Sequence, residues 1–452
     1  MSTSSTDLSA EERLVQAFEA NEGQALNGAA SLGEIRREAI SRFSTLGLPG
    51  PKSEAYKYSP VTRALRHEYE VNVDAEPEHG VTESDVDDLL LPGLDAHIIT
   101  LVNGRFDADL SRIGDLPDGV IARDFHGASA EHADLISEHF AQYADHRERV
   151  FVALNTAFTK DGAFVYVPNN TILEKPIHVL NVTSTDRDLF IQPRNLVIAE
   201  QSASATVIET DHTLTDSQTF TNAVTEIAVG ANAHVDHYKV QAEGENASQV
   251  NNISAYQTRD SLFSTTTFTL SGRLVRNNLH ITADAENCES RLYGLFMGRD
   301  EMHVDNSTLV DHTMPNCMSD ELYKGILDDD ATGVFNGKVF VHRDAQNIKA
   351  YQSNDNILLT NDADIYTKPE LEIYADDVQC SHGATSGQLD EEAMFYLRSR
   401  GLSRSQAQSM LLVAFAGDIV DHVEVEPLRE VLSETVTERF AETSEAATRW
   451  KA

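Results

Sequence analysis

The reactive side chains that carry the most information in this 452-residue chain lie in the segment Cys380-Ser381-His382. If the strand that contains Val378 continues through this segment, Cys380 and His382 project from one face, because side chains alternate along a strand. A thiolate and an imidazole are both good ligands for iron. One such pair cannot complete a coordination sphere, so the spacing by itself leaves two interpretations open, part of a metal site or ordinary packing.

Two further groups of histidine and cysteine are candidate ligands. His234 and His237 flank Asp236 in an expected strand, and positions i and i+3 of a strand face opposite sides, so the two imidazoles cannot hold one ion. His312 and Cys317 lie on either side of an expected turn and can approach each other, although a structural role is favoured for both. Neither group predicts a metal site.

The segment from Asp330 to Val339 superficially resembles a phosphate-binding loop. A Walker loop has four residues between its glycines and a Ser or Thr after its lysine, whereas here three residues separate Gly333 from Gly337, and Val339 follows Lys338. We therefore predict no nucleotide site in this segment or elsewhere in the chain. The chain also lacks the Gly-x-Ser-x-Gly elbow of serine hydrolases.

The charge of the chain excludes one large class of partners. The sequence has 73 Asp and Glu against 35 Lys and Arg, which gives a formal net charge of −38. Such a chain repels phosphate backbones, so nucleic-acid binding is not expected. We interpret the excess acid as halophilic adaptation, because molar salt shortens the Debye length to about 3 Å and removes the repulsion between carboxylates. An acidic partner-binding face is the alternative.

The sequence also bears on location. Residues Met1 to Asp7 have neither the basic nor the apolar part of a signal peptide. The longest uninterrupted apolar run, Met410 to Ala416, is far too short to span a bilayer, so no membrane segment is expected. The three cysteines, Cys288, Cys317 and Cys380, are odd in number and widely spaced, which favours a reducing compartment. We expect a cytoplasmic protein.

Residues 1–150 are predicted to form a mostly helical N-terminal region. Ser9 and Glu12 have the spacing of a capping box at a helix start. A later helix is expected around Ala130 to Arg147, and His97 to Gly104 is expected to be a strand and turn. The region as a whole is expected to cap the β-rich part of the chain.

Residues 151–387 have a different pattern, in which short β-rich runs alternate with Asn, Asp, Gly and Ser turns. More than 200 residues of short strands exceed an ordinary sandwich, whereas a solenoid, whose coils stack on one another, accommodates them. Turn-like segments such as Asp344-Ala345 and Asp362-Ala363 recur about every 14 to 18 residues. The pattern predicts a mainly β chain with a β-helix core.

Residues 388–452 are predicted to form a helical C-terminal domain. Asp390 can cap a first helix that Gly401 ends, Ser403 with Gln406 opens a second, and Pro427 begins a third. The second helix has an apolar stripe suited either to packing on the solenoid or to binding a partner. Its members are Ala407, Met410, Leu411, Ala414 and Phe415.

The sequence around Cys380 closely resembles the SufB/SufD family of iron-sulfur cluster assembly proteins. The matching segments run from Leu371 to Thr385, Phe395 to Gly401, Leu322 to Ile326 and Val334 to Lys338. The resemblance is to SufD more than to SufB, since SufB has a Glu-His-Glu type sequence where this chain has Cys380-Ser381-His382. One departure is Tyr56, where the family usually has Trp.

The resemblance implies a right-handed parallel β-helix between helical termini. It also implies a scaffold subunit, not an enzyme, that pairs with SufB through the β-helix and binds the ATPase SufC through its C-terminal helices, where the stripe from Ala407 to Phe415 is the candidate contact. Iron or a nascent iron-sulfur cluster would be held transiently and shared with SufB. His382 would lie near that interface, and Cys380 carries over less directly. The isolated chain would be able to form a homodimer.

Two other functions remain open from the sequence. β-Helical solenoids also house carbohydrate-active enzymes, and a fold does not settle a function. Those enzymes usually act outside the cell and need clustered acids or calcium ligands. A SufB-like scaffold that works as a homodimer is the second alternative.

Overall fold

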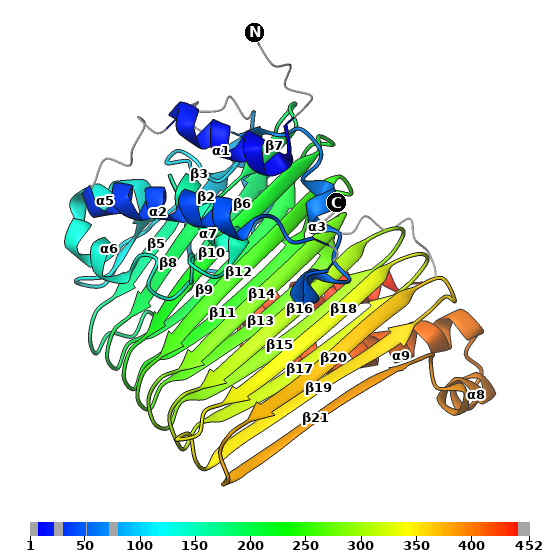
Figure 1. The fold of residues 1–452 in the computed structure, drawn as a ribbon. Coiled ribbons are helices and arrows are strands. Elements are labelled where there is room, and N and C mark those ends of the chain that lie inside the picture. Colours follow the sequence, from blue (N-terminus) through cyan, green and yellow to red (C-terminus); the bar gives the residue numbers. More distant parts are fainter. Residues whose placement is uncertain (1–7, 22–29, 51, 72–79, 442–452) are drawn as a thin grey trace.

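The computed structural model describes residues 8–21, 30–50, 52–71 and 80–441, and its main feature is a parallel β-solenoid (Figure 1). Two sheets form its walls, and the coils supply strands to them alternately. Neighbouring coils pair in parallel and in register, so that Thr332 lies between His303 and Asp364. The expected mainly β chain with a solenoid core and helical ends is confirmed.

The first sheet, sheet A, runs from the N-terminal region to the last coil. Its described strands are β1 (Glu70–Val71), β4 (Ile121–Asp124), β5 (Ala163–Val167), β7 (Leu189–Ile191), β8 (Arg194–Ala199), β10 (Thr219–Val229), β12 (Ala247–Gln257), β14 (Leu274–Ala283), β16 (His303–His312), β18 (Thr332–Val341) and β20 (Asp364–Ile373).

The second sheet, sheet B, forms the opposite wall. Its described strands are β2 (His97–Val102), β3 (Arg105–Phe106), β6 (Ile177–Thr183), β9 (Ser204–Thr213), β11 (His234–Ala242), β13 (Leu262–Ser271), β15 (Glu289–Gly298), β17 (Met318–Leu327), β19 (Ile348–Leu358) and β21 (Val378–Gly387). Because β2 pairs with β6, the N-terminal region contributes to the solenoid wall. The domain boundaries at 150 and 387 stay a prediction.

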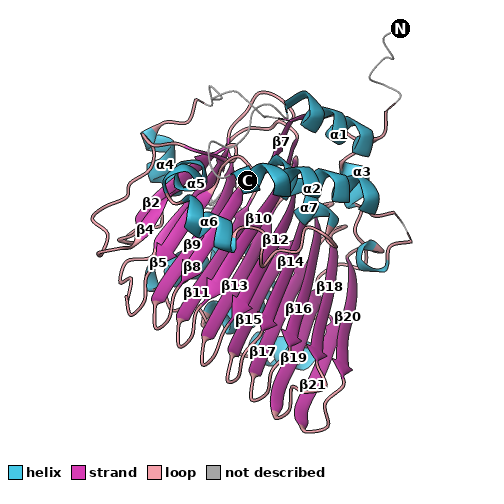
Figure 2. Cartoon of the chain, turned by 60° about the vertical axis from the view of Figure 1, so that its left-hand side comes forward, coloured by secondary structure: helices cyan, strands magenta, loops and turns pink. Residues whose placement is uncertain are grey.

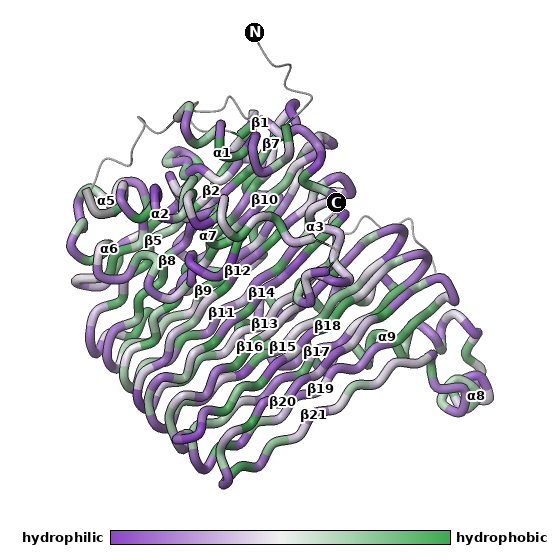
Figure 3. Tube along the Cα trace, viewed as in Figure 1, coloured by the Kyte–Doolittle hydropathy of each residue, from purple (hydrophilic) through white to green (hydrophobic). Residues whose placement is uncertain are grey.

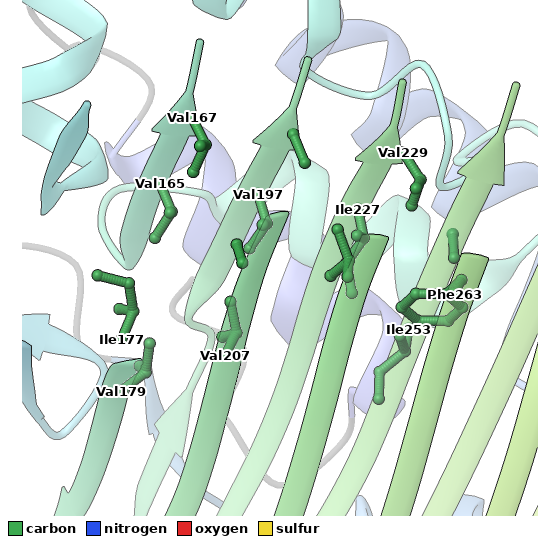
Figure 4. Packing of buried hydrophobic residues seen from close by; sticks show 14 of the residues in the cluster. Val165, Val167, Ile177, Val179, Val197, Val207, Ile227, Val229, Ile253 and Phe263 are labelled. Carbon is green, nitrogen blue, oxygen red and sulfur yellow. The ribbon is translucent and has the colours of Figure 1, made fainter. Parts of the chain in front are cut away.

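The first coils are held together by aliphatic side chains that stack at equal register (Figure 4). Val165, Val197 and Ile227 lie side by side on sheet A, and they share one buried cluster with Val179 and Val207 of sheet B. β-Branched residues suit this arrangement because they fill the space between pleated surfaces. Polar residues gather at the turns, as the tube in Figure 3 shows.

A row of left-handed residues runs along one turn edge of the solenoid, and we call it the turn ladder. Its members have positive φ and recur once a coil: Asn170, Ser202, Asn232, Asp260, Asn287, Asn316 and Asn347. Asn and Asp tolerate this conformation better than other residues with a Cβ. Their side chains also bond from coil to coil, for example Asn347 Nδ2 to Asn316 Oδ1 at 2.9 Å.

The N-terminal helices mainly cover the outer face of sheet A (Figure 2). Ser9 and Glu12 form the expected capping box at the start of α1, with bonds of 2.8 and 3.2 Å. A short helix, α4, instead packs on sheet B. The described helices are α1 (Ala10–Asn21), α2 (Ala30–Leu46), η2 (Glu54–Tyr56), α3 (Val61–Ala64), α4 (Glu83–Leu89), α5 (Phe125–Glu131), α6 (Ala133–His139) and α7 (Val150–Phe158).

The single helix expected around Ala130 to Arg147 is wrong. The structure has α5, α6 and then an irregular segment, with α7 following from Val150. The reason is a distant carboxylate: Glu226 of β10 accepts hydrogen bonds from the amides of Ala141, Tyr143 and Ala144 at 2.8 to 2.9 Å. These bonds hold the segment in a non-helical form.

The C-terminal helices are α8 (Glu391–Ser399), α9 (Arg404–Val420) and α10 (Glu426–Arg439). Of these, α9 and α10 cover the outer face of sheet B, and α8 packs against α9. As expected, Asp390 caps α8 and the Ser403–Gln406 capping box opens α9. Leu412 and Ile419 of α9 are buried in one cluster with Phe268 and Leu295 of the sheet. The helices therefore pack along the side of the solenoid, and its last coil stays uncovered.

Candidate functional site

The last coil is the open end of the solenoid. In the described part of the chain β20 pairs only with β18, and β21 pairs only with β19, so each leaves one edge without a neighbouring strand. From Ser381 to Gly387 every residue of β21 is exposed. A strand edge of this kind offers unpaired N–H and C=O groups to another chain.

Cys380 and His382 both lie on β21, and the prediction that one face of a continuous strand carries them is confirmed. The register sets Cys380 beside Ala350 and His382 beside Gln352 of β19. Cys380 is half-buried in a small apolar cluster with Ile348 and Ala350, and burial raises the pKa of its thiol. His382 is exposed. The imidazole is therefore the more accessible of the two groups.

A polar column leads inward from His382. Residues paired across successive coils share a face, so Glu321, Gln352 and His382 follow one another along the interior. Gln352 Nε2 donates to Glu321 Oε2 at 2.8 Å, and Thr308 Oγ1 donates to Oε1 at 2.6 Å. Because Glu321 is buried, its pKa is raised to about 7. A proton-binding carboxyl thus lies two coils beneath the exposed imidazole.

A second group of buried charges lies deeper in the interior. Lys239 Nζ donates to Glu209 at 3.0 Å and to Asp211 at 2.8 Å, and His237 Nε2 lies 3.3 Å from Glu209. Burial alone would raise the pKa of Glu209, but Lys239 and His237 hold it below its usual value. The sequence analysis missed this network, because alternating polar residues in a strand normally indicate a solvent-facing side. The available signal was a lysine that follows two acids, Glu209 and Asp211, by about the length of one coil.

The other histidine and cysteine candidates lie apart from the last coil. His234 Nε2 contacts Asp236 at 3.1 Å on the outer side, and His237 points inward, so the expected opposite orientation is confirmed. His312 contacts Ser319 at 3.0 Å, whereas the Cys317 thiol donates to the carbonyl of Ala285 at 3.2 Å. The segment from Asp330 to Val339, which superficially resembles a phosphate loop in sequence, lies mostly in strand β18 (Thr332–Val341).

Within the described residues no cluster of three or more His, Cys, Asp or Glu side chains has the arrangement of a metal site. The final strand β21 carries two side chains that commonly bind metals, Cys380 and His382. Two ligands do not complete a coordination sphere, so an iron site at this place needs further ligands.

The apolar stripe of α9 is divided by the structure. Ala407 is buried, Leu411 and Phe415 are half-buried, and Met410 and Ala414 are exposed. Phe415 lies under the ammonium of Lys324 of β17, 4.3 Å from ring centre to nitrogen. One part of the stripe therefore packs against the rest of the protein, and the other part is exposed to solvent.

Two aromatic side chains of α8 were missed as surface candidates. Phe395 is 75% exposed and Tyr396 is 56% exposed, while Met410 of α9 is 57% exposed. The signal was present in the sequence, because Met394 takes the buried position and an adjacent aromatic pair must then face outward. Large exposed apolar side chains on neighbouring helices are typical of an interaction surface.

Membrane insertion through helices finds no support. Of the helices that the structure describes, none combines the length and the apolar character needed to cross a bilayer.

The fold and the open end together define a β-solenoid protein with helices along both sides, an unfinished last coil, and a thiol and an imidazole on the final strand. Residues 181–415 match the family model described as SUF system FeS cluster assembly, SufBD core domain, and residues 8–179 match the SufBD protein N-terminal region. The chain belongs to the SufB/SufD family of iron-sulfur cluster assembly proteins.

Relatives resemble the chain over most of its length. An iron-sulfur cluster assembly SufBD family protein of Synechocystis is 32% identical over 89% of this chain and 90% of its own. The SufD proteins of Escherichia coli and Bacillus subtilis are 30% and 26% identical, each over 89% of this chain and 92% of its own. These similarities support SufD as the branch of the family, and the relatives are named for cluster assembly.

Proposed function

We propose that this chain is the SufD-type scaffold subunit of a SufBCD complex, without catalytic activity of its own, and that it works in the cytoplasm. Within that complex it pairs with SufB, binds the SufC ATPase, and helps iron to enter and a nascent cluster to form. The observation that carries the proposal is the open last coil with His382 on its final strand. Family membership favours this role over the carbohydrate-active alternative.

The open edges of β20 and β21 are the proposed contact with SufB. A partner solenoid that adds its own strands here satisfies the free backbone groups and continues both sheets. The same edges would let two copies of this chain pair when SufB is absent, which is the homodimer alternative. Measuring the mass of the isolated chain and of its equimolar mixture with SufB distinguishes the two assemblies.

His382 is the proposed ligand of this chain for iron or for the transient cluster. Its imidazole is exposed on the strand that the partner would meet, and a neutral imidazole binds iron through one nitrogen. Cys380 is a weaker candidate, because its thiol is half-buried and burial raises its pKa, which disfavours the thiolate that binds metal. The remaining ligands would come from SufB.

The test compares His382→Ala, Cys380→Ala and the matched control Ser381→Ala, which alters the side chain between them. Each complex is purified from cells, and its iron, sulfide and ATPase activity are measured. We expect His382→Ala to leave assembly and ATPase activity intact but to lower cluster content strongly, with a smaller loss for Cys380→Ala and none for Ser381→Ala. Wild-type cluster content in an intact His382→Ala complex would show that the ligands lie wholly on the partner.

The exposed side chains of α8 and α9 are the proposed SufC contact. Removing residues 388–452 is a poor test, because α9 and α10 bury the outer face of sheet B. Phe395→Ser with Met410→Ser keeps that packing, and Ile172→Ser, at a distant residue that is 68% exposed, is the matched control. We expect the double variant to lose SufC in a pull-down and the control to retain it. Equal retention by both would place the contact elsewhere.

A further inference from the structure

A groove lies on the outer face of sheet A, under the chain between α2 and β1. It consists of two adjoining cavities of about 460 and 290 Å³, which share Pro60, Arg63 and His303. Volumes of this size are typical of small-molecule sites. The groove is separate from His382 and from the C-terminal helices.

The chain segment that covers the groove, which includes Tyr56, Tyr58 and Ser59, is firmly attached to the solenoid. Ser59 and Arg276 both bond to the carboxylate of Asp305, and the Arg276 guanidinium lies 4.0 Å from the centre of the Tyr56 ring. This contact gives Tyr56, where the family usually has Trp, a packing role. Further along, Tyr58 stacks on Tyr366 of β20 with ring centres 4.2 Å apart. The cavity walls are therefore preformed.

The lining is basic, although the chain as a whole is strongly acidic. Lys57, Arg63 and Arg66 line the larger cavity, and Arg273 joins Arg63 in the smaller one. Within the described residues none of these four cations has a carboxylate within 4.0 Å, and the one acid of the two linings is Glu301. Lys57 does contact the Tyr58 ring, 4.8 Å from its nitrogen to the ring centre. In a chain with 73 acids and 35 bases, four cations that hold no carboxylate among the described residues make this groove locally attractive to an anion.

His303 adds a neutral polar atom to the floor of both cavities. Its Nε2 is buried and has no hydrogen-bond partner among the described residues. Burial and the neighbouring Arg276 lower the pKa of the imidazole to about 4, so it is uncharged near neutral pH. A buried ring nitrogen without a partner is costly, and a ligand in the groove can supply the missing hydrogen bond.

We propose that this groove binds a small phosphate-bearing anion, with Arg63 and Arg273 on its phosphate oxygens and the Nε2 of His303 completing the contact. A guanidinium can pair with two oxygens of either a carboxylate or a phosphate, but a phosphate has enough oxygens to engage Arg63 and Arg273 together, whereas one guanidinium already occupies both oxygens of a lone carboxylate. A small ligand is favoured because the net charge of −38 repels a long polyanion such as nucleic acid, whereas the local cations attract a compact one.

The test is calorimetric titration of the full chain with inorganic pyrophosphate, at a fixed KCl concentration in which the chain is folded. Arg63→Gln and His303→Phe are compared with Arg343→Gln, which removes an exposed arginine from a distant turn. We expect Arg63→Gln to weaken binding about tenfold, because it removes a charge-assisted hydrogen bond. His303→Phe should weaken binding less, and Arg343→Gln should leave it unchanged.

Citrate, titrated in parallel, tests the chemical class. We expect citrate to bind at least tenfold more weakly than pyrophosphate. Equal binding of both anions would overturn the assignment to phosphate, because it would show a general response to charge. Absence of pyrophosphate binding by the unaltered chain, or equal losses in Arg63→Gln and Arg343→Gln, would overturn the site itself.

Discussion

Glu321→Gln is the substitution that best tests the polar column beneath His382. The carboxyl of Glu321 is buried and accepts hydrogen bonds from Thr308 and Gln352. The new amide can keep the bond from Thr308 through its oxygen. Rotation of the Gln352 amide by 180° lets the new amide donate to its Oε1, an atom that is now buried without a partner among the described residues. The change therefore removes an ionisable group with little loss of packing.

The magnitude follows from the raised pKa. Burial moves the pKa of Glu321 from 4.5 to about 7. Below pH 4.5 the carboxyl is protonated in both states and costs nothing. Between pH 4.5 and 7 the folded state binds more protons than the unfolded state, so stability falls as the pH rises, and the loss is complete above about pH 7. At 1.36 kcal/mol for each pKa unit, the cost at pH 8 is about 3 kcal/mol.

The assay is urea unfolding of the wild type and the variant at pH 5 and pH 8 in the same salt. Titration of other groups is common to both proteins and cancels in the difference. We expect Glu321→Gln to gain about 2 to 3 kcal/mol relative to the wild type between pH 5 and pH 8. Glu434→Gln, on the exposed side of α10, is the control and should gain nothing. If the wild type and Glu321→Gln lose stability in parallel over this range, the carboxyl is not buried as described.

Three further predictions concern the whole chain and its packing. Because the net charge is −38, raising KCl from about 0.1 M to 2 M should raise the thermal unfolding midpoint, and a flat or falling midpoint would contradict the halophilic interpretation. Lys239→Met leaves Glu209 buried without its lysine partner and should lower the free energy of unfolding in urea by about 3 to 5 kcal/mol. Lys349→Met, at an exposed position, should lower it little. Equal losses in the two variants would refute the burial argument. Leu412→Ala, at the interface of α9 with sheet B, should lower the free energy of unfolding by about 2 to 5 kcal/mol. Leu411→Ala, at a half-buried position, should lower it clearly less. The reverse order would mean that α9 presents its other face to the sheet.

The solenoid was predictable because its evidence is local. Each coil needs two short β-rich runs and two turns, and the spacing of turns such as Asp344-Ala345 and Asp362-Ala363 corresponds to half a coil. The strand that carries Cys380 and His382 was predictable for the same reason. Caps such as Ser403 with Gln406 are also local, since the two partners are three residues apart.

The errors came from contacts between distant residues. The helix expected from Ala130 to Arg147 is interrupted because Glu226, more than 80 residues away, binds its backbone amides. The buried ion pairs of Lys239 were missed because alternating polar residues have the same pattern whether they face water or the interior of a solenoid. The stripe on α9 was placed on one face, but the sheet buries Leu412 and leaves Met410 exposed.

The turn ladder has a consequence for the length of the molecule. Equivalent residues such as Asn287 and Asn316 occupy the same place in successive coils, so a whole coil can be gained or lost between them without breaking either sheet. Each such event moves β21 by one strand spacing, about 4.8 Å, while its own sequence stays the same. The distance between the flanking helices and His382 can thus change only in discrete steps. Gain or loss of whole coils during evolution would change the span of an assembly by the same steps.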